Sequence, residues 1–88
     1  MKQKIRMPFG KKNKNMAESK EKVIEIIGSK IRETRINKGL SMEKVAHLSG
    51  LSYSQVIRIE NAKINTSIYQ LYLISKALEV TMGEICDI

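Results

Sequence analysis

The sequence has few of the residues on which disulfide, metal and catalytic sites depend. Its 88 residues include one cysteine, Cys86, and one histidine, His47, which cannot form an internal disulfide or a cysteine–histidine metal cluster. No apolar run is long enough to span a bilayer, and the basic start of the chain lacks the apolar stretch of a signal peptide. These absences exclude secreted, membrane and metal-dependent classes. We expect a cytoplasmic protein with no cofactor and no enzymatic activity.

Proline is equally scarce, and the positive charge of the chain is concentrated near the single proline. Pro8 is the only proline, and residues 1–15 around it hold six basic residues and no acidic one. Residues 1–22 carry +6 from eight basic and two acidic residues, whereas the rest of the chain carries +1 from eight basic and seven acidic residues. We predict a flexible basic arm at 1–18 and a single domain at 19–88. The charge of the arm favours a polyanionic partner.

The domain shows the period of amphipathic helices and no sustained alternation typical of strands. We predict an all-α fold with helices at about 19–37, 42–48, 52–60, 67–78 and 82–86. Ser41 is a natural N-cap of the second helix. Each of the last three helices starts with a hydroxyl residue followed three positions later by Gln or Glu, which predicts a capping box. The pairs are Ser52 and Gln55, Ser67 and Gln70, and Thr81 and Glu84.

The stretch from Met42 to Asn61 predicts a helix-turn-helix, because two short helices are joined by a three-residue connection. Gly50 in this connection accepts the positive φ of a tight turn, as does Gly39 at the end of the first helix. Ala46 is small where the two helices must cross. The residues predicted to anchor the pair to the core are Val45, Ala46, Leu48, Leu51, Val56 and Ile59.

Five short motifs follow one another along residues 27–85. They are I-G-x-x-I-R-x-x-R from Ile27, K-G-L-S from Lys38, V-A-x-x-S-G-L-S from Val45, R-I-E-N from Arg58 and K-A-L-E-V-T from Lys76. In these motifs the chain resembles the phage-repressor/Cro-like (XRE-type) helix-turn-helix domain, and the resemblance covers nearly the whole length of that domain. The resemblance implies a five-helix, lambda-repressor-like bundle that binds double-stranded DNA as a dimer, with the helix at 52–60 in the major groove.

The resemblance also implies roles for individual residues. Base edges would be contacted by Tyr53, Ser54, Gln55 and Arg58. Phosphates would be contacted by Ser41, Ser52, Asn61, Lys63 and Asn65, which set the register of the protein on the duplex. Arg35 and Glu60 match a pair that is bridged inside many members of the family. Because a guanidinium can bond both acceptors of a guanine edge, Arg58 predicts a guanine in each half-site.

The chain departs from the family pattern at three places. Met42 replaces a frequent Gln and cannot hydrogen-bond a phosphate. Ala62 stands after Asn61 where Gly is common, so either the backbone differs there or Asn61 takes the left-handed conformation. Thr66 replaces a frequent proline. These departures affect individual contacts more than the fold.

The fourth helix, with Ile68, Tyr69 and Tyr72, and the C-terminus carry more apolar side chains than one core face needs, which favours a homodimer surface. Its predicted residues are Ile68, Tyr72, Met82, Ile85, Cys86 and Ile88. The leading hypothesis is a small, repressor-like transcription regulator, associated with the nucleoid, that binds a near-palindromic operator as a homodimer. The alternative is an antitoxin or protein-interaction module that uses the same fold with little intrinsic recognition of DNA sequence. Its partner would be a toxin or a co-regulator.

Overall fold

The computed structural model describes residues 17–88, which form five helices and, within that range, no strand. They are α1 (Lys20–Asn37), α2 (Met42–Ser49), α3 (Tyr53–Glu60), α4 (Ile68–Leu78) and α5 (Met82–Ile85). The predicted all-α fold is confirmed, and every predicted helix is found. Almost all of the predicted arm at 1–18 lies outside the described residues. No helix between residues 17 and 88 has the length and apolar character needed to cross a bilayer.

The helix starts are set by local hydrogen bonds. In all five helices a serine or threonine N-cap accepts a hydrogen bond from the backbone N–H three residues later. The three predicted capping boxes form in full at the starts of α3, α4 and α5. Gly39 and Gly50 adopt φ values of +71° and +78°, as predicted. Each serine or threonine N-cap stabilises its helix by about 1 kcal/mol. The helix starts are therefore determined by segments of about four residues.

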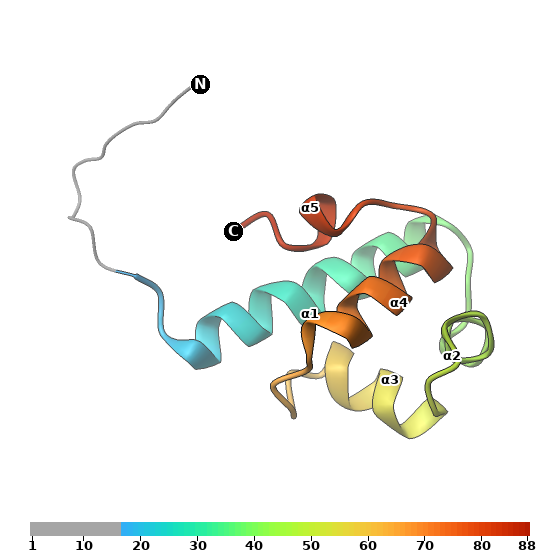
Figure 1. Ribbon diagram of the computed structural model, residues 1–88, viewed down its shortest axis with the longest axis horizontal. Coiled ribbons are helices and arrows are strands. Elements are labelled where there is room, and N and C mark those ends of the chain that lie inside the picture. Colours follow the sequence, from blue (N-terminus) through green and yellow to red (C-terminus); the bar gives the residue numbers. More distant parts are fainter. Residues whose placement is uncertain (1–16) are drawn as a thin grey trace.

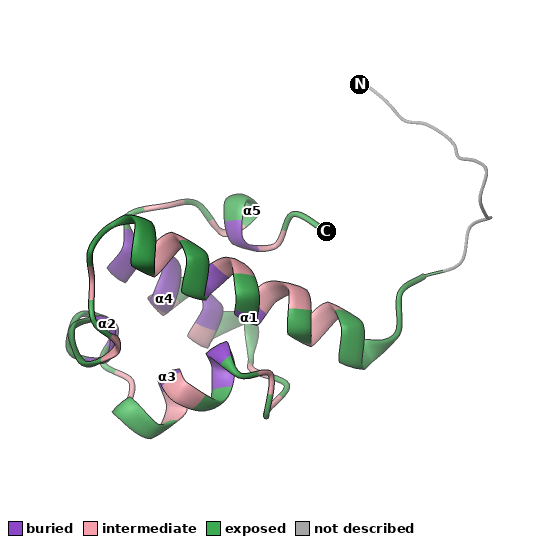
Figure 2. Cartoon of the chain, turned by 180° about the vertical axis from the view of Figure 1, so that it is seen from behind, coloured by how far each residue is buried: buried purple, intermediate pink, exposed green. Residues whose placement is uncertain are grey.

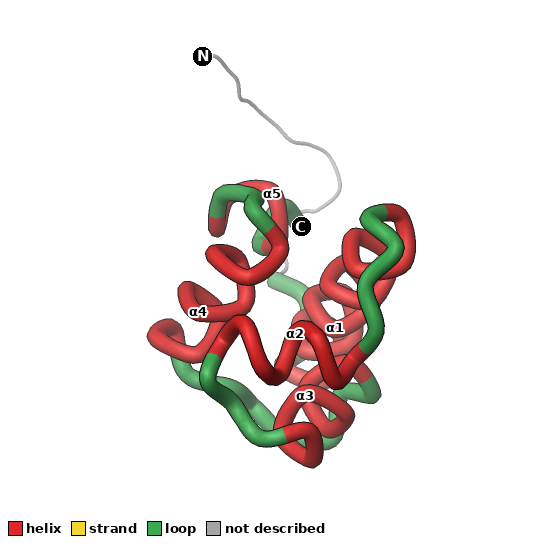
Figure 3. The backbone as a smooth tube through the Cα atoms, turned by 90° about the vertical axis from the view of Figure 1, so that its right-hand side faces the viewer, coloured by secondary structure: helices red, strands yellow, loops and turns green. Residues whose placement is uncertain are grey.

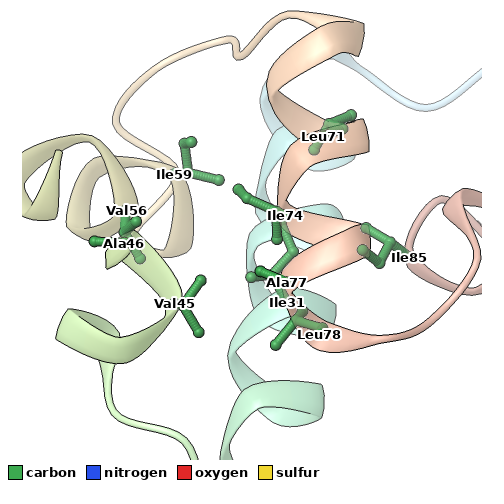
Figure 4. Packing of buried hydrophobic residues seen from close by; sticks show 10 residues of the cluster. All are labelled: Ile31, Val45, Ala46, Val56, Ile59, Leu71, Ile74, Ala77, Leu78 and Ile85. Carbon is green, nitrogen blue, oxygen red and sulfur yellow. The ribbon is translucent and has the colours of Figure 1, made fainter. Parts of the chain in front are cut away.

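The helices pack around one apolar core, with α3 at one edge of the bundle and α5 at the opposite side (Figure 1). The tube view shows α2 lying across the space between α1 and α4 (Figure 3). Every helix contributes to the core, which is drawn in Figure 4. Its members are Ile31, Val45, Ala46, Val56, Ile59, Leu71, Ile74, Ala77, Leu78 and Ile85.

The prediction that Leu48 faces the core is wrong, because its side chain is 49% exposed. The buried side of α2 is formed by Val45, Ala46 and Ser49. At about 100° per residue, Leu48 points about 110° away from the centre of that stripe. Ser49 is accommodated inside because its hydroxyl donates to the carbonyl of Ala46 and accepts from the N–H of Leu51.

Gly28 sets the distance between α1 and the end of α3. A Cβ atom at this position would lie 2.6 Å from the carbonyl oxygen of Ile59 and 2.8 Å from that of Glu60. Both atoms belong to the backbone, so they cannot move aside as a flexible side chain would. The absence of a side chain at Gly28 therefore allows α3 to rest directly on α1.

Candidate nucleic-acid interface

The outward side of α3 carries the residues predicted to contact DNA bases. Val56 and Ile59 are buried, whereas Ser54 and Arg58 are exposed and Tyr53 is 46% exposed. Figure 2 shows the first residues of α3 as exposed, with buried residues gathering toward its end. A short amphipathic helix is thus anchored on one side and open on the other.

Gln55 differs from the other predicted base-contacting residues, because its side chain is engaged within the protein. Its Oε1 accepts a hydrogen bond from the N–H of Ser52 at 3.0 Å, and the hydroxyl of Ser52 accepts from the N–H of Gln55 at 3.1 Å. The side chain of Gln55 is half-buried. In this conformation Gln55 stabilises the start of α3, because its Oε1 is engaged in the capping box.

The residues predicted to contact phosphates lie at two helix starts and in the loop after α3. Ser41 caps α2 by accepting from the N–H of Lys44 at 3.0 Å, and Ser52 caps α3. The three loop residues, Asn61, Lys63 and Asn65, are exposed. Met42, at the start of α2, is half-buried and packs against the core. The loss of a polar side chain there is therefore accompanied by an additional apolar contact.

The turn after α3 has its left-handed residue at Ala62, with a φ of +58°. Asn61 has a φ of −91°, so the alternative in which Asn61 is left-handed is contradicted. The N–H of Ala62 donates to the carbonyl of Ile59, and the N–H of Lys63 donates to that of Arg58. This is a Schellman motif, which places the left-handed residue one position after the C-cap, and the C-cap is Asn61.

Arg35 and Glu60 form an ion pair that joins the end of α1 to the end of α3. Nε and Nη2 of Arg35 donate to the two carboxylate oxygens of Glu60 at 2.7 and 3.1 Å. The remaining Nη1 donates to the carbonyl of Leu40 at 2.9 Å, in the turn before α2. The hydrogen bond to Glu60 raises the pKa of the Arg35 guanidinium above its ordinary value. The pair thus links three segments that position the helix-turn-helix.

The residues predicted to form a dimer surface do not all lie at the surface. Ile68, Tyr72 and Ile88 are exposed, while Met82 and Cys86 are half-buried against the core. Ile85 is only 1% exposed, so its assignment to this surface is corrected. Figure 4 shows it approaching α4 from the side opposite Val45. Within the single turn of α5, Ile85 is the fully buried residue, and Met82 packs beside it at the edge of the core.

Tyr69, one of the surplus apolar residues of the fourth helix, belongs to this surface as well. Its ring stacks on that of Tyr72, with 6.2 Å between the ring centroids, and 68% of Tyr69 is exposed. Ile68, beside it at the start of α4, is 76% exposed. The exposed apolar side of α4 is therefore formed by three neighbouring residues, Ile68, Tyr69 and Tyr72, and we call it the α4 patch.

Comparison with known proteins connects this geometry to a family. Residues 31–85 match the family model HTH_3, described as helix-turn-helix. The restriction-modification controller protein C.AhdI from Aeromonas hydrophila is 35% identical over 70% of this chain and 94% of its own, with a TM-score of 0.69. The wild-type restriction-modification controller protein C.Esp1396I is 32% identical over 67% of this chain and 77% of its own, with a TM-score of 0.65.

The fold of the chain is also similar to that of a regulator with lower sequence identity. The clp gene regulator ClgR from Corynebacterium glutamicum is 22% identical over 72% of this chain and 67% of its own, with a TM-score of 0.69, and shares the fold. No curated protein sequence matches the chain.

Proposed function

Because the chain belongs to the helix-turn-helix family, we propose that it is a DNA-binding transcription regulator that inserts α3 into the major groove. The observation that carries this proposal is the division of α3 into two sides. Val56 and Ile59 are buried, while Ser54 and Arg58 are open to solvent. A helix held in this way can present side chains to base edges without rearrangement of the core.

The rigidity of α3 supports the proposal, because recognition of base edges requires side chains at fixed positions. A capping box holds the start of α3, and a Schellman motif holds its end. The two hydrogen bonds from Arg35 to Glu60 attach that end to α1. All three constraints act on a helix of eight residues, which would be only marginally stable by itself.

The chemistry of the exposed residues suggests how bases and phosphates are divided among them. We assign base contact to Tyr53, Ser54 and Arg58, with Arg58 bonding the N7 and O6 acceptors of a guanine. Gln55 contributes by holding the start of the helix. We assign phosphate contact to five exposed residues at the starts of α2 and α3 and in the loop after α3: Ser41, Ser52, Asn61, Lys63 and Asn65.

Action as a homodimer is the second part of the proposal. One copy of α3 spans only a few base pairs, and a second copy doubles the sequence that is recognised. The α4 patch and the exposed Ile88 provide apolar surface of the kind that mediates association. Two-fold symmetry would place the half-sites of a near-palindromic operator about 34 Å apart, which is one helical turn of DNA.

A selection from random-sequence duplexes tests this function directly. The full chain should enrich a near-palindromic motif that contains a guanine in each half-site. Failure to enrich any motif at moderate salt would contradict sequence-specific binding. It would favour the alternative of a protein-interaction module if a stoichiometric partner that covers α3 also co-purified with the chain.

A further inference from the structure

A small apolar cleft lies where the first turns of α1 meet the loop between α3 and α4. Its apolar walls are formed by Val23, Ile24, Ile27, Ile59, Ile64 and Leu71. The volume of the cleft is about 90 Å³. Pockets for drug-sized ligands are about 300–1,000 Å³, so this cleft has room for a group of the size of one side chain.

Two of the residues that line the cleft lie outside the core cluster and outside the set of side chains packed against it. Ile27 and Ile64 pack against the core cluster, whereas Val23 and Ile24 are half-buried and do not belong to that contact set. These two residues lie in the first turns of α1, which starts at Lys20. The end of α1 nearest to the N-terminal segment therefore presents branched apolar side chains to a cleft that the described residues leave open.

We propose that the phenyl ring of Phe9, from the N-terminal segment of the same chain, occupies this cleft. The segment joins α1 directly, and Phe9 precedes Lys20 by eleven residues. An extended stretch of that length spans about 35 Å, whereas Ile27 lies only about 10 Å along α1 from Lys20. The segment is therefore long enough to fold back to the cleft.

The composition of the segment points to the same occupant. Phe9 is the only phenylalanine of the chain and stands in an otherwise strongly basic sequence. Electrostatic attraction to a polyanion requires the basic residues and gives no role to an aromatic ring. Burial of the ring in the cleft supplies that role, because it removes apolar surface from water on both sides of the contact.

Docking of Phe9 has a consequence for DNA binding, and this step rests on the proposed function. Asn65, in the loop assigned to phosphate contact, also lines the cleft. Lys11, Lys12 and Lys14 lie between Phe9 and α1 in the sequence. With Phe9 docked, these lysines are held beside the loop and lose less conformational freedom when they contact phosphates. Docking of Phe9 thus holds the basic residues of the N-terminal segment near the phosphate-contacting loop.

Docking can be tested without DNA by comparing NMR spectra of the full chain and the Phe9→Ala variant. The signals of Ile24 and Ile64 should shift, because the ring current of Phe9 is lost. The exposed Ile36 and Leu48, which do not line the cleft, should keep their shifts and serve as internal controls. The Ile5→Ala variant is a matched control and should leave the signals of the cleft unchanged.

A spin label gives a second readout that does not depend on the ring current. With Cys86→Ser as background, a nitroxide attached to Lys11→Cys should broaden Ile24 and Ile64 more than Leu48. Adding Phe9→Ala should abolish this difference. Equal broadening with and without the ring would overturn the proposal. Benzene provides a further check. If benzene shifted the cleft signals of the full chain while Phe9→Ala left them unchanged, the cleft would be open to a small ligand and the docking of Phe9 would be contradicted.

The DNA consequence is measured separately on the selected operator. Phe9→Ala should reduce the slope of log K against log salt by up to about 2.7, the value for three phosphate contacts. The NMR result stands whether or not an operator is found. Conversely, if an operator is enriched but the cleft signals do not respond to Phe9→Ala, the docking proposal fails and the proposed function remains.

Discussion

At the scale of single residues, two backbone positions carry much of the geometry around α3. Gly28 lets α3 approach α1 because it has no side chain, and its Cβ position is closed off by two backbone oxygens. Ala62 occupies a left-handed conformation that a residue with a Cβ adopts at a cost. Glycine is required at position 28, whereas at position 62 glycine would be less strained than the alanine that is present. Substitutions at these positions should therefore act in opposite directions.

Gly28→Ala should lower the free energy of unfolding by about 1–3 kcal/mol, because the added methyl group overlaps the end of α3 and forces the helices apart. Chemical denaturation measures this loss. Gly83→Ala is the matched control, since a Cβ there meets nothing closer than the hydroxyl of Thr81 at 3.7 Å. Equal stability of the Gly28 variant and wild type would show that α1 and α3 can separate at no cost.

Ala62→Gly should raise the free energy of unfolding by about 1 kcal/mol, because it relieves the left-handed strain at the end of α3. Thermal or denaturant unfolding measures the gain. Ala77→Gly, in the buried side of α4, is a control that should instead destabilise the protein, since glycine weakens a helix interior. A loss of stability in the Ala62 variant would contradict the strain argument.

At the scale of the elements, α3 depends on its neighbours for its position. It packs against α1 and α2, and the ion pair between Arg35 and Glu60 attaches its last residue to α1. The side chains of that pair are 11% and 2% exposed, so neither partner can be solvated alone. The two ends of α3 therefore differ: its first residues are open to solvent, and its last two, Ile59 and Glu60, are buried.

Glu60→Ala should cost about 3–5 kcal/mol of stability, because it leaves the guanidinium of Arg35 buried without its partner. Denaturant unfolding measures the loss, and Arg35→Met combined with Glu60→Leu should recover a large part of it. Glu25→Ala breaks the exposed pair with Lys22 and should change stability by less than about 1 kcal/mol. If the two alanine variants were equally stable, the buried pair would have no special role.

Arg58→Ala should leave the fold intact and weaken binding to the selected operator by about 1–3 kcal/mol, with preference lost at one base position in each half-site. Fluorescence anisotropy on operator variants measures both effects. The side chain of Arg58 is exposed, so unfolding should not contribute. An equal loss of affinity on operator and on random DNA would show that Arg58 contacts phosphate instead of a base.

At the scale of the whole molecule, geometry and charge are provided by different parts of the chain. The helix-turn-helix lies in the portion with a net charge of +1, whereas residues 1–22 carry +6. A nearly neutral domain attracts a duplex only weakly over long distances, and a basic segment compensates for this. The N-terminal segment should therefore account for much of the salt dependence of binding.

Deletion of residues 2–15 removes six basic residues and should reduce the slope of log K against log salt by up to about 5. Titrations at several salt concentrations measure the slope, and a circular dichroism spectrum confirms that the helices are retained. The expected reduction is larger than for Phe9→Ala, which removes the anchor but keeps the charge. An unchanged slope would show that the segment makes no phosphate contact.

Much of the fold was predictable because its signals are local. The capping boxes at Ser52, Ser67 and Thr81 are encoded within four residues each, and they form as predicted. Leu48 and Ile85 were assigned wrongly because the direction of a side chain on a short helix depends on how the helix is rotated against its neighbours. Helical periodicity over one or two turns does not determine that rotation. The base and phosphate contacts remain predictions.

Local sequence signals are enough to predict the number and approximate boundaries of the helices, the helix-turn-helix and the separation of charge, since each depends on residues that are adjacent or one turn apart. Three-dimensional packing is needed to establish that Gly28 is a contact point between α1 and α3, that Ile85 is buried, and that a cleft opens beside Ile24 and Ile64. These features arise from the distances between segments far apart in the chain. Such distances are set when the whole core packs at once, so no single segment of the sequence contains them.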